Sequence, residues 1–225
     1  MAAYDLEEQE QLAQLKAWWN EYGNLVTVVM LVCSAIALAY QGWNWYQRSQ
    51  ASEAAAIYGA VQRAQMAGDA QKTKQGTAEL VDNYSRTPYA PLAALASAKS
   101  AVDVGDLKTA QLQLQWVVDH GKDEVRDIGR LRLAAVLAEQ KEFDAAVKQL
   151  DTTPSSGFVA RFAELKGDIL LLQGNKEAAR AAYQQAQSKL DEAAKADGAK
   201  NEGRDEHEAP RTPLQQKLDA VGGSK

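Results

Sequence analysis

The chain has 225 residues and a formal net charge of −5, and this length allows one domain of roughly 150 residues together with tails and an anchor. Its 25 basic and 30 acidic side chains leave no segment with the basic excess that binding to a phosphate backbone requires, so nucleic acid is not an expected partner. The single cysteine excludes an intramolecular disulfide and a zinc site made of cysteines.

A short acidic tail and an uncharged, strongly apolar segment begin the chain. No charged residue lies between Glu21 and Arg48. A helix over residues 25–46 would be about 33 Å long, close to the roughly 30 Å thickness of the hydrocarbon layer of a bilayer. We therefore predict an acidic tail over residues 1–23 and a single transmembrane helix over residues 24–46.

Aromatic side chains gather at both ends of this segment. Amphipathic rings favour the two headgroup zones of a bilayer, so this pattern is more typical of a transmembrane helix than of a buried helix in a soluble protein. The predicted membrane-interface residues are Trp18, Trp19, Tyr22, Tyr40, Trp43, Trp45 and Tyr46.

Two alternatives to a retained anchor fit the sequence less well. Residues 37–39 resemble a small-residue cleavage site, but a signal peptide begins with a basic head and this head is acidic. A lipid attached to Cys33 would require a small residue where Val32 stands. The charges leave the orientation of the anchor open, because neither flank has a clear excess of Lys and Arg, and they lean slightly against a cytoplasmic tail.

The following segment, residues 47–192, is predicted to form an all-α domain. It is rich in good helix formers and has no alternating strand pattern. Apolar side chains recur three or four residues apart, and each such stripe is expected to face a core. The stripes are Leu107, Ala110, Leu114 and Val117; Ile128, Leu131, Ala135 and Ala138; Phe158, Phe162, Leu165, Ile169 and Leu172; and Ala179, Tyr183, Ala186 and Leu190.

Short turns and a degenerate repeat connect these helices. Gly105-Asp106 and Gly174-Asn175 each combine a left-handed helix end with a cap for the next helix, which predicts antiparallel hairpins. Small residues recur at intervals of 36 and 33, near the 34-residue tetratricopeptide period, and again twelve residues before each of these positions. The predicted repeat-packing residues are Ala98, Ala110, Ala134, Ala146, Gly167 and Ala179.

Residues 50–84 are expected to add a less regular fourth pair of helices. Stacked pairs of this kind bury a continuous core and leave a concave face, lined by the first helix of each pair, that can bind a peptide or helix. The alternative is a scaffold without a ligand in the groove.

The inventory of reactive side chains is poor. Apart from carboxylates and lysines it contains His120, His207 and Cys33, and no second histidine follows His207 one helical turn later. We therefore predict no catalytic, cofactor-binding or metal-binding residue and do not expect an enzyme.

The C-terminal region is predicted to consist of a mobile linker over residues 193–211 and a short amphipathic helix with a tail over residues 212–225. Leu214, Leu218 and Val221 would share one face of that helix. It can either dock on the repeat stack or remain frayed.

The order of these parts resembles the bacterial ancillary SecYEG translocon subunit family, also called the YfgM family. The similarity covers residues 4–190 and resumes at residues 213–218, and the chain departs from the family in a long acidic insertion over residues 193–211. The stretches that carry the resemblance are Asp144-Ala145-Ala146-Val147 leading to Leu150-Asp151, Phe158 to Gly167, and Gly174-Asn175-Lys176 through Ala178-Ala179-Arg180 to Tyr183.

The resemblance implies a single-pass inner-membrane protein with its N-terminus in the cytoplasm and its repeats in the periplasm. It implies association with the Sec translocon and with a membrane-anchored periplasmic prolyl-isomerase-like chaperone, and help in passing exported client chains to periplasmic chaperones. It also implies that the N-terminal tail restrains a cytoplasmic response regulator. It implies no catalytic residue and no cofactor.

The leading hypothesis is therefore a membrane-tethered protein-binding adaptor at the Sec translocon. The alternative is a structural or regulatory tetratricopeptide scaffold of the cell envelope without a role in export. Altered handling of exported chains after deletion would favour the first, and defects confined to envelope geometry or division would favour the second.

Overall fold

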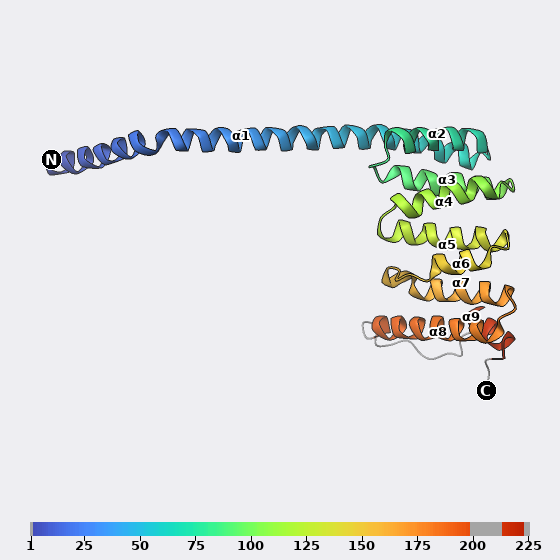
Figure 1. The fold of residues 1–225 in the computed structure, drawn as a ribbon. Coiled ribbons are helices and arrows are strands. Elements are labelled where there is room, and N and C mark those ends of the chain that lie inside the picture. Colours follow the sequence, from blue (N-terminus) through green and yellow to red (C-terminus); the bar gives the residue numbers. More distant parts are fainter. Residues whose placement is uncertain (1, 199–212, 223–225) are drawn as a thin grey trace. The chain divides into compact units, whose positions relative to one another are not determined.

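The computed structural model describes residues 2–198 and 213–222, which form helices and turns without a strand (Figure 1). The chain divides into two compact units, Met1–Ser52 and Glu53–Lys225. The helices are α1 (Ala2–Met66), α2 (Ala70–Asn83), α3 (Tyr89–Asp103), α4 (Leu107–His120), α5 (Asp123–Glu139), α6 (Phe143–Leu150), α7 (Val159–Leu172), α8 (Lys176–Gly198) and α9 (Pro213–Ala220), with the 3-10 turn η1 (Ser156–Phe158) before α7.

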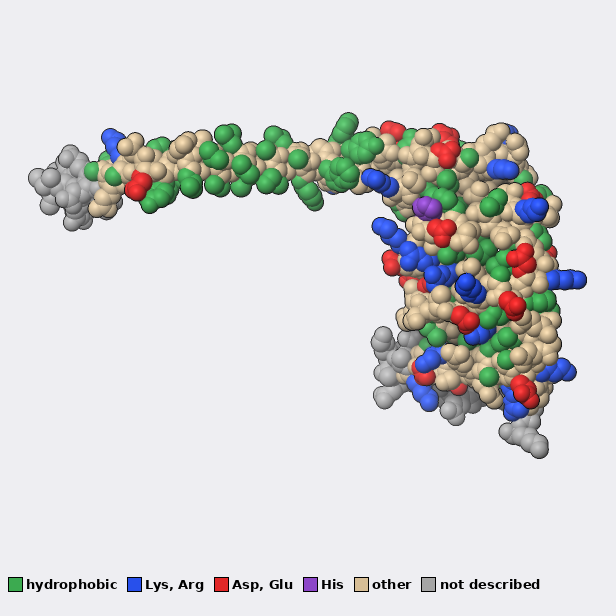
Figure 2. Space-filling view, viewed as in Figure 1, with side chains coloured by type: hydrophobic (Ala, Val, Ile, Leu, Met, Phe, Trp, Pro, Cys, Tyr) green, Lys and Arg blue, Asp and Glu red, His purple; other side chains and the backbone are tan. Residues whose placement is uncertain are grey.

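The first unit consists of the N-terminal part of α1, which is long and apolar enough to cross a membrane by its length and composition. Its aliphatic side chains are exposed, and Figure 2 shows them along the helix surface. Thr27 donates a hydrogen bond to the Gly23 carbonyl oxygen at 2.7 Å, and Ser34 donates one to the Met30 carbonyl oxygen at 2.8 Å. Both hydroxyls are thereby satisfied within the helix, as an apolar solvent demands.

The second unit is a stack of antiparallel helix pairs, in which each helix from α2 onward packs against the next one along the chain (Figure 1). The end of α1 packs against α2: Val61 shares a buried cluster with Leu80 and lies close to Gly76. The pairs α3–α4, α5–α6 and α7–α8 follow. The first helices also touch one another, α3 against α5 and α5 against α7. The predicted class, an all-α tetratricopeptide-like stack after one apolar helix, is confirmed.

Three of the four hairpin turns share one design. A glycine with positive φ ends the first helix, and the following Asp or Asn accepts a hydrogen bond from a backbone N–H of the second helix. These turns are Gly68-Asp69, Gly105-Asp106 and Gly174-Asn175. The turn between α5 and α6 departs from this design, because Lys141 has a φ of 65° and Glu142 makes no side-chain cap.

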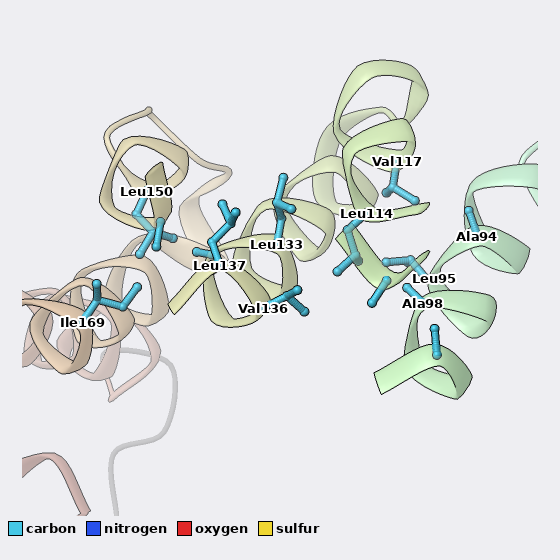
Figure 3. Close-up of a cluster of buried hydrophobic side chains, with 14 of the residues drawn as sticks. Ala94, Leu95, Ala98, Leu114, Val117, Leu133, Val136, Leu137, Leu150 and Ile169 are labelled. Atoms are coloured by element: carbon cyan, nitrogen blue, oxygen red, sulfur yellow. The ribbon is translucent and has the colours of Figure 1, made fainter. Parts of the chain in front are cut away.

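The largest core cluster runs through α3 to α7 and is built from aliphatic side chains and alanines (Figure 3). A second cluster joins the end of α1, α2 and α3, and a third joins α7, α8 and α9. The stripe predicted over residues 128–138 faces the main core at Ile128, Leu131 and Ala138, but Ala135 is exposed, and Leu133 and Leu137 are buried outside the stripe. In two other predicted stripes the last residue, Leu172 or Leu190, is exposed. Helix α5 packs against α3, α4, α6 and α7, so its buried surface is wider than one stripe.

The predicted domain boundaries stay predictions, and two observed limits lie close to them. The second compact unit begins at Glu53 rather than at residue 47. Helix α8 continues to Gly198 and so includes the first residues of the predicted linker, while the remainder of that linker lies outside the described residues.

Candidate protein-binding surface

A cleft of about 360 Å³ lies between the first helices of two neighbouring pairs, α3 and α5. This is the face on which stacked tetratricopeptide-like hairpins present a concave surface. The residues that line the cleft are Ala98, Lys99, Val102, Leu114, Arg132, Ala135, Val136 and Glu139.

The cleft has an apolar floor and a charged rim. Leu114 and Val136 are buried in the main core, so their side chains are held in place by packing on the other side of the helices. On the rim, the Lys99 ammonium pairs with the Asp103 carboxylate at 2.8 Å, and an Arg132 guanidinium N–H donates to the Leu95 carbonyl oxygen at 3.4 Å. Such a surface can accept an apolar side chain of a peptide or helix and hold polar groups around it.

The six predicted repeat-packing residues are all buried, and they lie on six successive helices from α3 to α8. Gly167 shows why a small residue is needed, because a Cβ atom there would lie 2.5 Å from Cε1 of the Tyr183 ring. Two further glycines lie equally close to a neighbouring helix and were not predicted as packing residues. A Cβ on Gly76 would lie 2.6 Å from Val61 Cγ2, and one on Gly129 would lie 2.7 Å from Val117 Cγ1.

The predicted membrane-interface residues lie on α1 and are all exposed. Within each group the rings contact one another: the ring centroids are 5.9 Å apart for Trp18 and Tyr22, and 6.4 Å apart for Trp43 and Tyr46. Their location in the headgroup zones stays a prediction.

The C-terminal helix α9 docks on α7 and α8, an outcome that the sequence left open. Leu214 is 4% exposed and packs among Ala163, Ala179, Tyr183 and Ala186. Leu218 and Val221 are partly buried against the same cluster. Helix α9 has only eight residues, and a helix of that length is not stable by itself, so its order depends on this surface.

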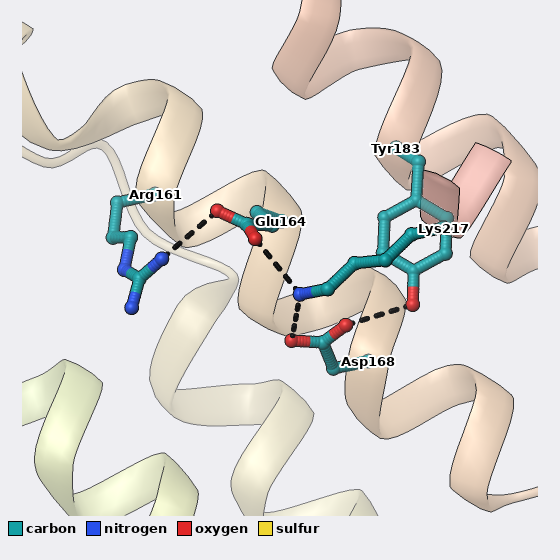
Figure 4. A network of polar contacts seen from close by, with 5 residues as sticks. All are labelled: Arg161, Glu164, Asp168, Tyr183 and Lys217. Atoms are coloured by element: carbon teal, nitrogen blue, oxygen red, sulfur yellow. Dashed lines mark hydrogen bonds and ion pairs between the residues drawn. The ribbon is translucent and has the colours of Figure 1, made fainter. Parts of the chain in front are cut away.

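A network of five polar side chains links α9 to α7 and α8 (Figure 4). The Lys217 ammonium lies 2.8 Å from Glu164 Oε1 and 2.8 Å from Asp168 Oδ2, both on α7. The Tyr183 hydroxyl donates to Asp168 Oδ1 at 2.8 Å, and Arg161 Nη1 lies 3.0 Å from Glu164 Oε2.

The pKa values around Lys217 follow from this arrangement. Burial alone would raise the pKa of Glu164, but hydrogen bonding and ion pairing with Lys217 and Arg161 outweigh it and lower the pKa. Burial alone would lower the pKa of Lys217, but the carboxylates of Asp168 and Glu164 raise it. For Tyr183, burial and then the hydrogen bond to Asp168 both raise the pKa of the hydroxyl. Docked α9 therefore places the Lys217 ammonium between the carboxyl groups of Glu164 and Asp168.

A buried carboxylate on α5 was not predicted from the sequence. Asp127 on α5 is 5% exposed, and one of its oxygens accepts a hydrogen bond from the backbone N–H of Ser155 at 2.8 Å. The contact ties the connection between α6 and α7 to α5. A charged residue inside a helix gives no sequence signal for a contact 28 residues away.

The reactive side chains do not form a site in the part of the chain that the structure describes. The His120 ring stacks on Trp116 with centroids 4.4 Å apart, and Cys33 is exposed on α1. His207 lies outside the described residues. Within those residues, no three side chains of His, Cys, Asp and Glu are grouped so that they could hold a metal ion.

Comparison with known proteins places these features in a family. A family model described as "Tetratricopeptide repeat-like domain" matches residues 16–223. The chain is 33% identical over 186 residues to the ancillary SecYEG translocon subunit of Haemophilus influenzae, covering 82% of this chain and 91% of that protein. The chain belongs to the ancillary SecYEG translocon subunit family.

Other members of the family give the same result. The ancillary SecYEG translocon subunit of Aggregatibacter actinomycetemcomitans is 34% identical over 194 residues, covering 82% of this chain and 91% of the relative. That of Escherichia coli is 30% identical over 178 residues, covering 79% and 85%. No solved structure matches the chain. The predicted resemblance is confirmed, and the apolar helix together with these relatives fits a membrane-anchored protein.

Proposed function

We propose that the chain is a membrane-tethered protein-binding adaptor at the Sec translocon, which helps to pass exported chains to periplasmic chaperones. The observation that carries the proposal is the 30–34% identity, over most of the chain, to proteins named as ancillary subunits of that translocon. A stack of helix pairs with an apolar cleft supports a binding role, and an apolar helix at the N-terminus supports a tether. No chemical step is part of this function.

In this arrangement α1 crosses the inner membrane, residues 1–23 face the cytoplasm and the helical stack faces the periplasm. The tail is then available to a cytoplasmic response regulator, and the stack to a membrane-anchored prolyl-isomerase-like chaperone and to exported clients. Protease added to intact spheroplasts tests the orientation. Loss of the stack with survival of the tail is expected, and survival of the stack would refute the topology.

The cleft between α3 and α5 is the proposed contact surface for the chaperone or client. Ala135 is exposed and lines the cleft, so Ala135→Glu fills it with a charged side chain while leaving the core untouched. Ala181→Glu is a matched control, because Ala181 is also an exposed helical alanine and lies on α8 outside the cleft.

Co-purification after mild detergent extraction tests the adaptor. The unmodified chain and Ala181→Glu are expected to retain Sec components and a periplasmic chaperone, and Ala135→Glu is expected to lose the chaperone. A clean absence of both classes of partner from the unmodified chain would refute the proposed function. Equal recovery of the chaperone by both variants would refute the assignment of the cleft.

A further inference from the structure

The surface of α7 and α8 beneath α9 has the properties of a binding site for an amphipathic helix. Its apolar part is a hollow lined by Ala163, Ala179 and Ala186, three small side chains that leave room for the Leu214 side chain beside Tyr183. Hollows of this kind bind the large apolar residues of a partner helix.

The polar part of the same surface requires a cation. Glu164 and Asp168 stand one turn apart on α7, and they share the Lys217 ammonium of α9 (Figure 4). Arg161 reaches only the outer oxygen of Glu164, and the Tyr183 hydroxyl reaches only one oxygen of Asp168. Without Lys217, two carboxylates of like charge face each other in a partly buried position, which is unfavourable.

The occupant of this surface is a short helix. Helix α9 packs against α8 and α7, with Leu214 beside Ala163 and with Lys217 beside two carboxylates of α7, and its eight residues are too few to form a stable helix unaided. The fourteen residues 199–212 join it to α8, so a high local concentration adds to its contacts in keeping it in place. A longer helix with the same pattern gains additional contacts, which offset the translational and rotational freedom that it loses on binding as a separate molecule.

We propose that the α7–α8 surface is a second protein-binding site, that α9 is its resident occupant, and that an amphipathic partner helix replaces α9 there. The partner helix carries two leucines four residues apart and a lysine directly before the second, as Leu214, Lys217 and Leu218 are arranged in α9. The proposal goes beyond the adaptor function and does not depend on which export components bind the α3–α5 cleft.

The test uses the full-length chain in detergent and a fluorescent probe, a 20-residue Ala-rich helix with leucines and a lysine at the spacing found in α9. Leu214→Asp removes the apolar anchor of α9 and Lys217→Glu reverses its charge, so both variants release α9 by different means. Both are expected to bind the probe at least tenfold more tightly than the unmodified chain in fluorescence anisotropy. Leu190→Asp, at an exposed leucine of α8, is the matched control and is expected to change nothing.

The charge requirement is tested in the released background. Adding Glu164→Gln and Asp168→Asn to Leu214→Asp is expected to weaken probe binding at least tenfold, and a probe with Glu in place of its lysine is expected not to bind. Circular dichroism establishes that each variant remains folded. If both released variants are folded and bind the probe no better than the unmodified chain, α9 is a fixed cap and the proposal is overturned.

A second outcome would also overturn it. If the unmodified chain forms a concentration-dependent dimer by light scattering, and Lys217→Glu abolishes that dimer, the external occupant of the surface is α9 of a second copy rather than the helix of a partner protein.

Discussion

Individual small residues set the distance between paired helices. At Gly167 the Tyr183 ring occupies the space that a methyl group would need, and this ring is fully buried and fixed through its hydroxyl to Asp168. The ring therefore cannot move aside without disturbing both the α7–α8 pair and the attachment of α9.

Gly167→Ala is accordingly expected to destabilise the chain by about 1–3 kcal/mol, the usual cost of overpacking a core. In a domain of this size, this corresponds to a decrease of several degrees in the melting temperature. Thermal unfolding followed by circular dichroism is the measurement. Gly59→Ala is the matched control: its Cβ would meet only Arg63 Nη1 at 3.8 Å, so a gain of about 0.5–1 kcal/mol is expected. Equal melting temperatures of the two variants would contradict this account.

At the turn between α5 and α6, Lys141 has a left-handed backbone conformation that is unfavourable for a residue with a side chain. A left-handed conformation costs a residue with a side chain about 1–2 kcal/mol, and the other three hairpins have glycine at this position. Lys141→Gly is therefore expected to stabilise the chain by about 0.5–1 kcal/mol after the higher entropy of the unfolded glycine is subtracted.

Urea unfolding compares this variant with Lys148→Gly. Lys148 occupies an ordinary position in α6, where glycine is expected to cost about 1 kcal/mol. Loss of stability in Lys141→Gly would mean that contacts of the lysine side chain outweigh the backbone strain.

At the scale of helices, the docking of α9 is expected to depend on pH at both ends of the range. The pKa of Glu164 is lowered in the folded state, so the stability that it contributes is present above its ordinary pKa of 4.5 and is lost as the pH falls through the folded value. The pKa of Lys217 is raised, so its contribution is present below the ordinary 10.5 and is lost as the pH rises through the folded value. The groups that face one another are Arg161, Glu164 and Asp168 of α7, Tyr183 of α8 and Lys217 of α9.

Methyl resonances of Leu214 report this docking directly, because that side chain is buried only when α9 is in place. They are expected to keep one position across neutral pH and to move toward unstructured values in acid. Glu164→Gln is expected to reduce the change seen in acid. A docking equilibrium that is unaffected down to pH 2 would contradict a contribution from this carboxylate.

Most helices could be predicted from the sequence, but only some of the contacts between them could. Gly105-Asp106 and Gly174-Asn175 predict hairpins correctly, because a turn depends on the glycine conformation and on a cap only a few residues away. The stripe predicted over residues 128–138 includes the exposed Ala135 and omits the buried Leu133 and Leu137, because α5 is apolar on several sides and overlapping stripes of similar strength cannot be ranked by period alone. The contact between Lys217 and Glu164 joins residues 53 positions apart, and no periodicity encodes such a pair.

At the scale of the whole molecule, the proposed membrane anchor would decide which partners the stack can meet. Leu31 lies within the predicted span and is exposed on α1. An arginine near the centre of a transmembrane helix costs about 2.5–3.5 kcal/mol on insertion scales, so Leu31→Arg is expected to reduce the fraction of the chain that stays in the membrane pellet after alkaline extraction. Gln14→Arg, outside the predicted span, is expected to remain in the pellet. Equal retention of both variants would show that residues 24–46 do not hold the chain in the bilayer.

The pairing of each helix mainly with its neighbours has a consequence for how the second unit comes apart. In such a linear array, disruption spreads step by step from the ends, because few contacts tie one end to the other. The terminal pair with α9 can therefore open and reclose many times while α3, α4 and α5 keep their arrangement. Amide protons of α4 are accordingly expected to exchange with solvent far more slowly than those of α9. The centre of the stack would then stay folded while its C-terminal end unfolds and refolds.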